Sequence, residues 1–172
     1  AAAEEFVRAE AVRILDRQPR IVACGSQFQQ NCASLALLRE VKRLAPQTVT
    51  MLGGQCCSGG QGRVLKEAFA WLDVVFSGEA DLALPPLLRL LLEYGADIPR
   101  ELLPPGPITA AGFHPDKHGE PVYAITPDMD ALPVPDHDDY FREFNEWPQR
   151  GQMLPYLAFE GGRGCDWAHR TG

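Results

Sequence analysis

The sequence lacks the features that mark several common functional classes. Its longest apolar runs are far too short for a membrane-spanning helix, and the first residues have no signal-peptide pattern. Acidic residues outnumber basic ones by 23 to 16, and the basic residues form no cluster, which argues against a nucleic-acid-binding surface. We therefore expect a cytoplasmic protein that binds neither a membrane nor nucleic acid.

Familiar short motifs are also missing. No G-K-[ST] sequence is present and no G-x-G-x-x-G opens a helix, so P-loop and dinucleotide sites are disfavoured. The five cysteines are irregularly spaced and include no C-x-x-C pair. This spacing argues against a disulfide framework and fits a reducing compartment.

What the chain does contain is a repeated alternation of short apolar runs and amphipathic segments. Hydrophobic residues make up 45% of its 172 residues, enough to bury a core. Alternating strands and helices form parallel β-α-β units with right-handed crossovers, so we predict an α/β fold with a doubly wound, Rossmann-like parallel sheet. The predicted helices are 1–18, 33–45, 60–72 and 82–95, and the predicted strands are 20–26, 48–54 and 73–81, the last including its loop.

The composition changes near residue 99. Eleven of the fifteen prolines lie between residues 99 and 157, where helical periodicity is weak. A short hairpin is expected to turn near Gly119, and 132–141 has the pattern of an extended, proline-stiffened connector. A new strand is expected to begin in MLPYLAFEGG. The predicted organisation is a first domain over 1–98, a linker over 99–153 and the start of a second domain over 154–172.

Three loops that follow the predicted strands contain small, polar and almost uncharged residues. In this fold ligands bind at the carboxyl ends of the strands, so these loops form the candidate site. Glycines let a backbone approach a bulky ligand, and amides and hydroxyls supply hydrogen bonds, which favours a large, polar, weakly charged cofactor. Glycines at strand ends are equally typical of ordinary turns. The candidate binding residues are Ser26, Gln27, Phe28, Gln29, Gln30 and Asn31 in loop 1 (25–31), Gly53, Gly54, Gln55, Cys56, Ser58, Gly59 and Gly62 in loop 2 (53–62), and Ser77, Gly78 and Glu79 in loop 3 (77–81).

Some polar groups of these loops have simpler explanations. Cys56 and Cys57 have no partner at metal-ligand spacing, and small cysteines commonly pack inside loops. The pair Glu79 and Asp81 suits acid-base chemistry, but a carboxylate at the start of a helix is also stabilised by the helix dipole. The four histidines lie at or beyond residue 114, outside all three loops, and are assigned no role.

Five segments resemble successive blocks of cobalamin-dependent radical S-adenosylmethionine enzymes, especially those that mature ribosomally made peptides. They are SQFQQNCASLAL, MLGGQCCSGGQG, DVVFSGEADLALP, MDALPVPDHDDYF and FEGGRGC, in the same order as in that family. Ser26-x-Phe28 followed by Gly53-Gly54 is similar to the S-x-L and GG elements of cobalamin-binding Rossmann domains, where two loops surround the buried dimethylbenzimidazole tail. The resemblance implies that the three loops bind cobalamin.

One element of those cobalamin domains is absent. Many of them carry a D-x-H-x-x-G loop whose histidine ligates cobalt, and this chain has no such sequence. The resemblance leaves two explanations open. Either the chain starts after the first strand of the domain, or cobalamin is bound without a histidine ligand.

The resemblance also bears on Cys165. In these enzymes an R-G-C turn supplies the first cysteine ligand of a [4Fe-4S] cluster, and Arg163-Gly164-Cys165 matches it, although EGGRGC replaces the commoner E-[ST]-S-R-G-C. The resemblance implies that Cys165 binds iron, that the other ligands follow in a partial TIM barrel beyond Gly172, and that one iron chelates S-adenosylmethionine. The alternative is a lone buried cysteine after a strand.

The function implied by the resemblance is C-methylation of an unactivated carbon in a peptide or peptide-like natural product. In that family methylcobalamin gives the methyl group, and the cluster, reduced by an electron donor such as flavodoxin, cleaves S-adenosylmethionine to a radical that abstracts hydrogen. With one of three thiolates, these 172 residues alone are expected to be inactive. Two alternatives stay open: a non-catalytic cobalamin carrier or sensor, and a flavodoxin-like domain for a different cofactor.

Overall fold

The computed structural model describes residues 2–157 of the chain. The chain divides into two compact units, Ala1–Ala131 and Leu132–Gly172. Cys165 and most of the expected second domain lie outside the described residues. No helix within the described part is long and apolar enough to cross a lipid bilayer.

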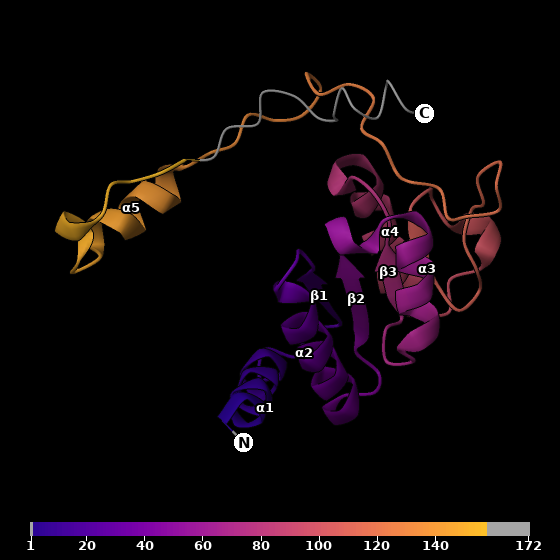
Figure 1. Ribbon diagram of the computed structural model, residues 1–172, viewed down its shortest axis with the longest axis horizontal. Coiled ribbons are helices and arrows are strands. Elements are labelled where there is room, and N and C mark those ends of the chain that lie inside the picture. The colour runs from indigo at the N-terminus through magenta and orange to yellow at the C-terminus, as the bar shows by residue number, and fades with distance from the viewer. Residues whose placement is uncertain (1, 158–172) are drawn as a thin grey trace. The chain divides into compact units, whose positions relative to one another are not determined.

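The first unit is built on a four-stranded open sheet (Figure 1). β1 (Ile21–Gly25), β2 (Val49–Gly53) and β3 (Val74–Phe76) are parallel neighbours, whereas β4 (Pro107–Ile108) pairs antiparallel with β3. All residues of β2 before its terminal glycine are buried, as expected for a parallel strand covered on both faces. The fold is therefore α/β with a mostly parallel open sheet, compatible with a Rossmann-like fold.

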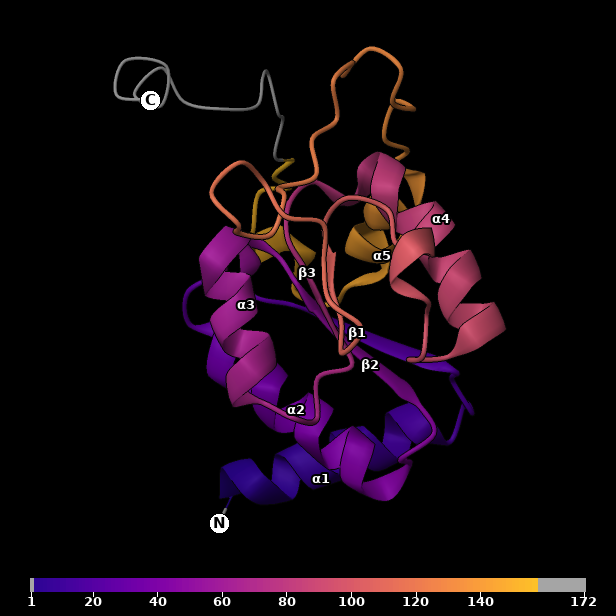
Figure 2. The same ribbon diagram turned by 90° about the vertical axis from the view of Figure 1, so that its right-hand side faces the viewer.

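Helices cover both faces of this sheet. α1 (Ala2–Leu15), α2 (Gln30–Leu44) and α3 (Gly59–Ala68) lie on one face, and α4 (Ala80–Tyr94) lies on the other. Figure 2 shows α3 and α4 on opposite sides of the strands. Alternate strand residues feed two cores because successive side chains point to opposite faces. The core under α1–α3 includes Val22, Leu52 and Val75, and the core under α4 includes Met51, Val74, Phe76, Leu87 and Leu91.

The ends of α4 differ in how well the sequence predicted them. Gly95 ends the helix as predicted, with a φ of 65° and its N–H donating to Leu91 O at 3.0 Å. The helix begins at Ala80 instead of residue 82, so Pro85 and Pro86 lie inside it, beyond the first turn. Because proline has no N–H, two carbonyls of the first turn lose their helical partner there.

Residues 96–131, most of which were expected to belong to a linker, pack as part of the first unit. Ile98, Leu103, Ile108 and Ala124 are buried, so apolar residues between the prolines anchor this segment to the sheet. It contains a short 3-10 helix, η2 (Arg100–Leu102), and the strand β4. The turn expected near Gly119 is present: Val122 N–H donates to His114 O at 2.9 Å, and Asp116 N–H donates to Glu120 O at 2.7 Å.

The second unit contains a helix that the sequence analysis did not predict. α5 (Asp138–Glu146) replaces the last part of the extended connector expected over 132–141, and η3 (Arg150–Gln152) follows it. The ring of Tyr140 contacts those of Phe141 and Phe144, at centroid distances of 5.2 and 6.1 Å. Tyr140 and Phe144 are four residues apart, and their contact stabilises α5 although prolines precede and follow it.

Candidate functional site

The three predicted loops meet at the carboxyl edge of the sheet (Figure 1). The register places Gly25 opposite Gly53, and Gly53 opposite Phe76, so β1, β2 and β3 end at the same level. Loop 2 begins with a 3-10 turn, η1 (Gln55–Cys57), before α3. The three loops therefore lie together as expected. The hydrogen bonds within and between them show which of their groups remain exposed to a ligand.

Loops 1 and 2 are joined directly through their backbones. Ser26 N–H donates to Gly53 O at 2.7 Å, and Cys56 N–H donates to Ser26 O at 3.2 Å. Gly54 has a φ of 110°, and a Cβ added there would lie 2.7 Å from Ser26 O. The contact between the two loops, apart from any ligand, therefore requires glycine at position 54.

Ser26 and Asn31 stabilise loop 1 from inside. Ser26 is fully buried, and its Oγ donates to Asn31 Oδ1 at 2.7 Å. The side chains that loop 1 presents to solvent are those of Gln27, Phe28, Gln29 and Gln30. Loop 1 thus offers three amides and one aromatic ring.

Phe28 stands out within loop 1. Its ring is 76% exposed, and its backbone has a φ of 40°, in the left-handed region that a bulky residue rarely occupies. A strained backbone conformation costs free energy, so ordinary turns avoid it. The strained positions that do occur in proteins are concentrated at functional sites. Phe28 is therefore a stronger candidate for ligand contact in the structure than its place in the sequence alone indicated.

Loop 2 presents Gln55 and Gln61 to solvent, whereas Ser58 and the amide of Gly59 form hydrogen bonds within the protein. Ser58 Oγ donates to Gln55 O at 3.1 Å, and Gly59 N–H donates to the buried Ser77 Oγ at 2.8 Å. A Cβ on Gly62 would overlap Cys57 O, so this glycine too is needed by the protein itself.

Cys57 is a packing residue in this loop. Its side chain is fully buried, and burial, together with the neighbouring Cys56, raises the pKa of its thiol to about 12. A thiol with so high a pKa stays protonated near neutral pH and is a poor nucleophile or metal ligand. The simpler of the two explanations for Cys57 therefore fits the structure.

Loop 3 is covered by residues 124–126, which the sequence analysis placed in the linker. Ala124 N–H donates to Ser77 O at 3.1 Å, Glu79 N–H donates to Ala124 O at 2.8 Å, and Thr126 N–H donates to Glu79 Oε2 at 2.6 Å. Gly78 has a φ of 113° and packs against the Ala124 backbone. The Glu79 carboxylate thus has a structural partner, and residues 124–126 form a border of the candidate site.

The face of the sheet toward α4 has a floor of small residues at this edge. Ala23 and Gly25 of β1 are exposed there. A Cβ on Gly25 would meet nothing within 4 Å, and one on Gly53 would meet only Phe76 Cβ at 3.6 Å. A Cβ at Gly54, Gly62 or Gly78 would collide with backbone atoms, whereas no protein atom would collide with a Cβ at Gly25 or Gly53.

The charged residues of the three loops, Glu79 and Asp81, are confined to loop 3. Loops 1 and 2 contain no charged residue. The nearest arginine along the chain, Arg63, donates to both carboxylate oxygens of Glu120 at 3.1 Å and pairs with Glu67. These hydrogen bonds raise the pKa of Arg63 and neutralise its charge within the protein.

Within residues 2–157 no group of three or more His, Cys, Asp or Glu side chains is arranged to hold a metal ion. Cys165, the predicted iron ligand, lies outside the described residues. No protein-family model matches the chain, and no curated protein matches it in sequence.

Proposed function

We propose that the first unit binds cobalamin at the carboxyl edge of its sheet. In the complete protein it would serve a radical S-adenosylmethionine enzyme that C-methylates an unactivated carbon of a peptide or peptide-like natural product. The observation that carries the proposal is that loops 1 and 2 lack charged residues, while this edge combines exposed amides, an exposed strained aromatic residue and a floor of small residues.

The chemistry of these residues fits a corrinoid. The corrin periphery carries carboxamide groups, which both donate and accept hydrogen bonds, as the exposed amides of Gln27, Gln29, Gln30 and Gln55 do. A phosphate-rich nucleotide would instead favour fixed positive charge, and loops 1 and 2 have none. The ring of Phe28 can lie against the flat macrocycle.

The nucleotide tail of cobalamin would lie on the floor formed by Ala23, Gly25 and Gly53. The direct contact between Ser26 and Gly54 closes the space between loops 1 and 2, whereas a Cβ added at Gly25 or Gly53 would meet no close contact, so we place the tail beside these two glycines on the α4 side of the strand ends. The two unconstrained glycines keep that side free of side chains.

The residues of loop 1 would face the lower side of the corrin. The four histidines lie at or beyond residue 114, outside loops 1, 2 and 3, so we propose that no histidine of this chain ligates cobalt and that Phe28, Gln29 or Gln30 lies nearest to it. When bound, methylcobalamin supplies a methyl group and the cluster with S-adenosylmethionine supplies the substrate radical. The part of this unit is to hold the cofactor in a fixed orientation and exclude water from its lower side.

Substitution of the two unconstrained glycines tests this site. Gly25→Val and Gly53→Val place a branched side chain on the floor while leaving the strands able to form, since β-branched residues suit strands. Equilibrium dialysis against hydroxocobalamin should show at least about tenfold weaker binding, a loss of about 1.4 kcal/mol, for each variant. Their urea midpoints should stay close to that of the unmodified chain.

Gly151→Val is the matched control, because a Cβ there also meets nothing within 4 Å but the residue lies in the second unit. It should bind as the unmodified chain does. If residues 1–172 bind no cobalamin, the proposed function fails. If the two floor variants bind normally, the tail position is wrong.

A cobalamin carrier or sensor without catalysis is the second candidate. It is favoured by the chemistry of loops 1 and 2, which offer hydrogen-bonding groups but no carboxylate or imidazole for acid-base work. Both candidates require the same cofactor site. They differ in whether the complete protein cleaves S-adenosylmethionine.

A further inference from the structure

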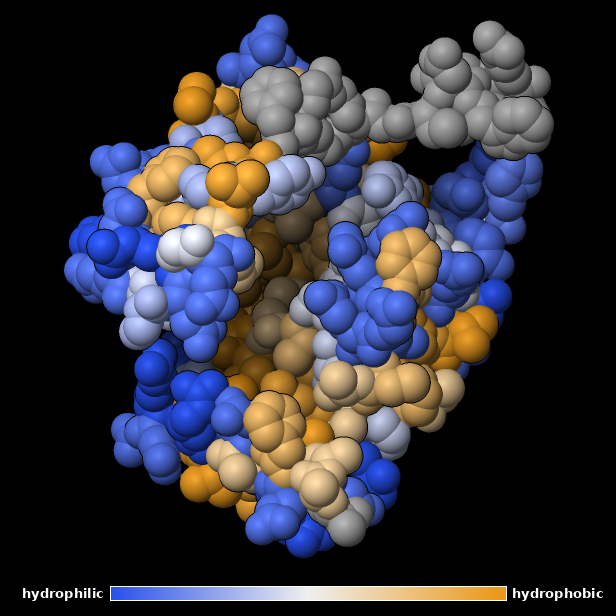
Figure 3. All heavy atoms as spheres, turned by 60° about the vertical axis from the view of Figure 1, so that its left-hand side comes forward, coloured by the Kyte–Doolittle hydropathy of each residue, from blue (hydrophilic) through white to orange (hydrophobic). Residues whose placement is uncertain are grey.

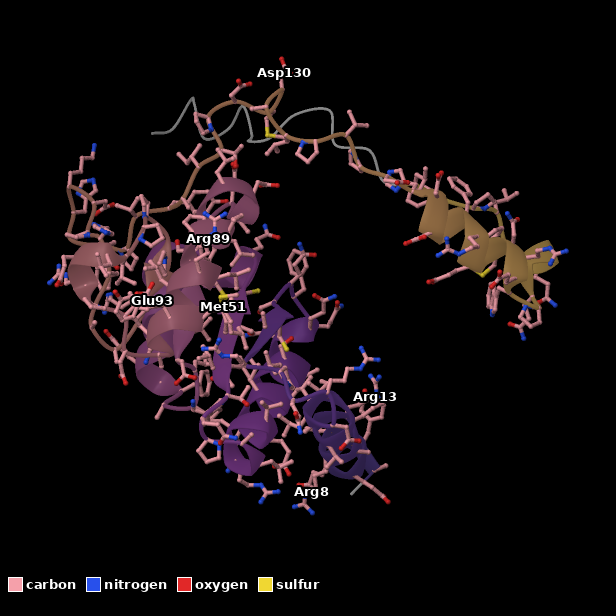
Figure 4. All side chains as sticks on the ribbon, turned by 180° about the vertical axis from the view of Figure 1, so that it is seen from behind. Arg8, Arg13, Met51, Arg89, Glu93 and Asp130 are labelled. Atoms are coloured by element: carbon pink, nitrogen blue, oxygen red, sulfur yellow. The ribbon has the colours of Figure 1, made fainter. Side chains whose placement is uncertain are left out.

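The aromatic residues of α5 in the second unit gather on one face of the helix. Tyr140, Phe144 and Trp147 follow one another at intervals of four and three residues, and Phe141 lies beside them. No residue of α5 is buried, and Tyr140, Phe141 and Trp147 are 37%, 38% and 38% exposed. Figure 4 shows the side chains of α5 standing out from the helix. An exposed cluster of large rings of this kind marks a surface that binds something.

Three of these rings line a hollow of about 500 Å³ together with two carboxylates. The rings of Tyr140 and Phe144 stack at an interplanar angle of 24°. The face of an aromatic ring is partially negative, and a carboxylate is fully so, which means that these lining groups favour a cation. The lining residues are Tyr140, Glu143, Phe144, Glu146, Trp147 and Pro148.

The basic side chains of this unit are engaged elsewhere. Residues 132–157 contain two arginines and no lysine. Arg142 pairs with Asp139, Nη2 to Oδ1, at 2.5 Å, and Arg150 Nη1 donates to a backbone carbonyl at 2.5 Å. No ion pair joins Glu143 or Glu146 to a basic side chain of residues 2–157. The two carboxylates of the hollow are therefore left for a cation from outside this unit.

An apolar hollow of the first unit provides a contrast. It has a volume of about 610 Å³ and opens between the first turns of α1 and α2. Figure 3 shows apolar residues gathered at the lower end of the molecule, where α1 begins. The carboxylate that lines this hollow, Glu10, accepts hydrogen bonds from Arg13 at 3.0 and 2.5 Å, and Figure 4 shows Arg13 on α1. Of the two hollows, only that of α5 combines several rings with carboxylates that no arginine neutralises.

Apolar side chains lie next to the hollow of α5. Met153, Leu154 and Tyr156, which follow η3, are all exposed. Tyr156 N–H donates to Tyr140 Oη at 3.1 Å, so this segment runs beside the first ring of the hollow. A ligand whose cationic group enters the hollow can therefore also contact apolar residues next to it.

We propose that the hollow of α5 binds an arginine side chain of a peptide whose neighbouring residues are apolar. A guanidinium stacks on aromatic rings and forms two parallel hydrogen bonds with a carboxylate, whereas the ammonium group of lysine is a point charge. Met153, Leu154 and Tyr156 would contact the neighbouring residues of the peptide. The peptide as the source of the arginine rests on the proposed function, whereas the preference for a cation rests on the hollow alone.

Two capped tripeptides, Leu-Arg-Leu and Leu-citrulline-Leu, test the proposal, because citrulline has the shape of arginine without its charge. Each is titrated into ¹⁵N-labelled residues 1–172 while the indole N–H of Trp147 is followed by nuclear magnetic resonance, its signal being assigned with Trp147→Phe. The arginine peptide should bind at least about fivefold more tightly than the citrulline peptide. It should shift the signal of Trp147 but not that of Trp71, which lies in the first unit.

Two substitutions test the carboxylates. Glu143→Gln and Glu146→Gln should each weaken binding of the arginine peptide at least about threefold and leave that of the citrulline peptide unchanged. Glu10→Gln is the matched control, because this carboxylate lines the hollow of the first unit, and it should bind both peptides as the unmodified chain does. Unchanged backbone amide shifts of α5 would show that the helix persists in the variants.

Three results would overturn the proposal: equal affinity for the two peptides, normal binding by both glutamine variants, or binding by residues 1–172 that is lost in the complete protein. The last would mean that another part of the protein fills the hollow. Cobalamin binding is scored separately. Residues 1–172 that bind the arginine peptide at Trp147 but no cobalamin would support the hollow while the proposed function failed, and the reverse result would overturn the hollow alone.

Discussion

At the scale of single residues, the glycines of the candidate site fall into two kinds. Gly54, Gly62 and Gly78 are fixed by the protein, because a Cβ at each would collide with backbone atoms. Gly25 and Gly53 have no such constraint. The sequence predicted a glycine-rich edge correctly but could not separate the two kinds, because the collisions involve residues 26, 57 and 124, which only the folded chain brings close.

Cys57 provides a prediction about pH. Its pKa rises from an ordinary value of 9.0 to about 12 in the folded protein, mainly because the thiolate would be buried. The folded state therefore holds this proton more tightly than the unfolded chain does. The resulting stability is fully present below pH 9 and is lost as the pH rises from there toward 12. The free energy of unfolding should fall between about pH 8 and about pH 10.5, and less steeply in Cys57→Ala.

Urea titrations at the two pH values measure this effect, and the comparison with Cys57→Ala isolates it from other groups that titrate in the same range. Cys32→Ala is the matched control, because that cysteine is exposed. It should lose stability with pH as the unmodified chain does. Identical slopes for Cys57→Ala and the unmodified chain would show that burial of this thiol does not contribute.

At the scale of elements, the strands and helices of residues 1–95 were predictable because each depends on local signals. Apolar runs of strand length, and breaks at Pro46 and Gly95, are visible without tertiary contacts. β4 was not predictable, since it has two residues, one of them Pro107, and forms only by pairing with β3. α5 was missed because the prolines around it outweighed the helical spacing of Tyr140 and Phe144.

The contribution of the contact between loop 3 and residues 124–126 to stability can be tested by substitution. Gly78→Ala should separate them, because the added Cβ meets the Ala124 backbone at a φ of 113°. The free energy of unfolding should fall by about 2 kcal/mol, the scale of a strained backbone position. The amides of Glu79 and Thr126, which donate hydrogen bonds in this contact, should exchange faster with solvent.

Gly119→Ala serves as the control for Gly78→Ala. Gly119 also has a positive φ, of 82°, but a Cβ there meets nothing within 4 Å. It should show the cost of backbone strain alone, without faster exchange at Glu79 and Thr126. Equal effects of the two variants would mean that strain, and not the collision with Ala124, explains the result.

At the scale of the whole molecule, the boundary between the units lies at 131/132, whereas the sequence placed the end of the first domain at residue 98. The composition does change at residue 99, but composition cannot show that Leu103, Ile108 and Ala124 reach back to the sheet. The convergence of the three loops was predictable for a different reason. Parallel strands end at the same edge, so the topology alone brings their loops together.

The role of Cys165 is a prediction about the complete protein. If it ligates iron, Cys165→Ala should abolish reductive cleavage of S-adenosylmethionine while cobalamin stays bound, because the two cofactors use different residues. Product analysis for 5′-deoxyadenosine and the absorbance of the bound corrinoid measure the two effects separately. Cys32→Ala, a change at an exposed cysteine of the first unit, should retain both.

Two outcomes would contradict this role. A Cys165→Ala protein that still cleaves S-adenosylmethionine would make Cys165 an ordinary structural residue. A complete, unmodified protein that binds cobalamin but never cleaves S-adenosylmethionine under reducing conditions would favour the carrier or sensor. Neither outcome would affect the proposed cobalamin site in the first unit.

The two edges of the sheet also differ in how readily each can pair with a strand of another protein. β4 is two residues long and contains Pro107, which has no N–H to offer, so this edge is a poor template for strand addition. β1 presents five residues with no proline. Of the two edges of the described sheet, β1 is therefore the better template for pairing with a strand of another chain.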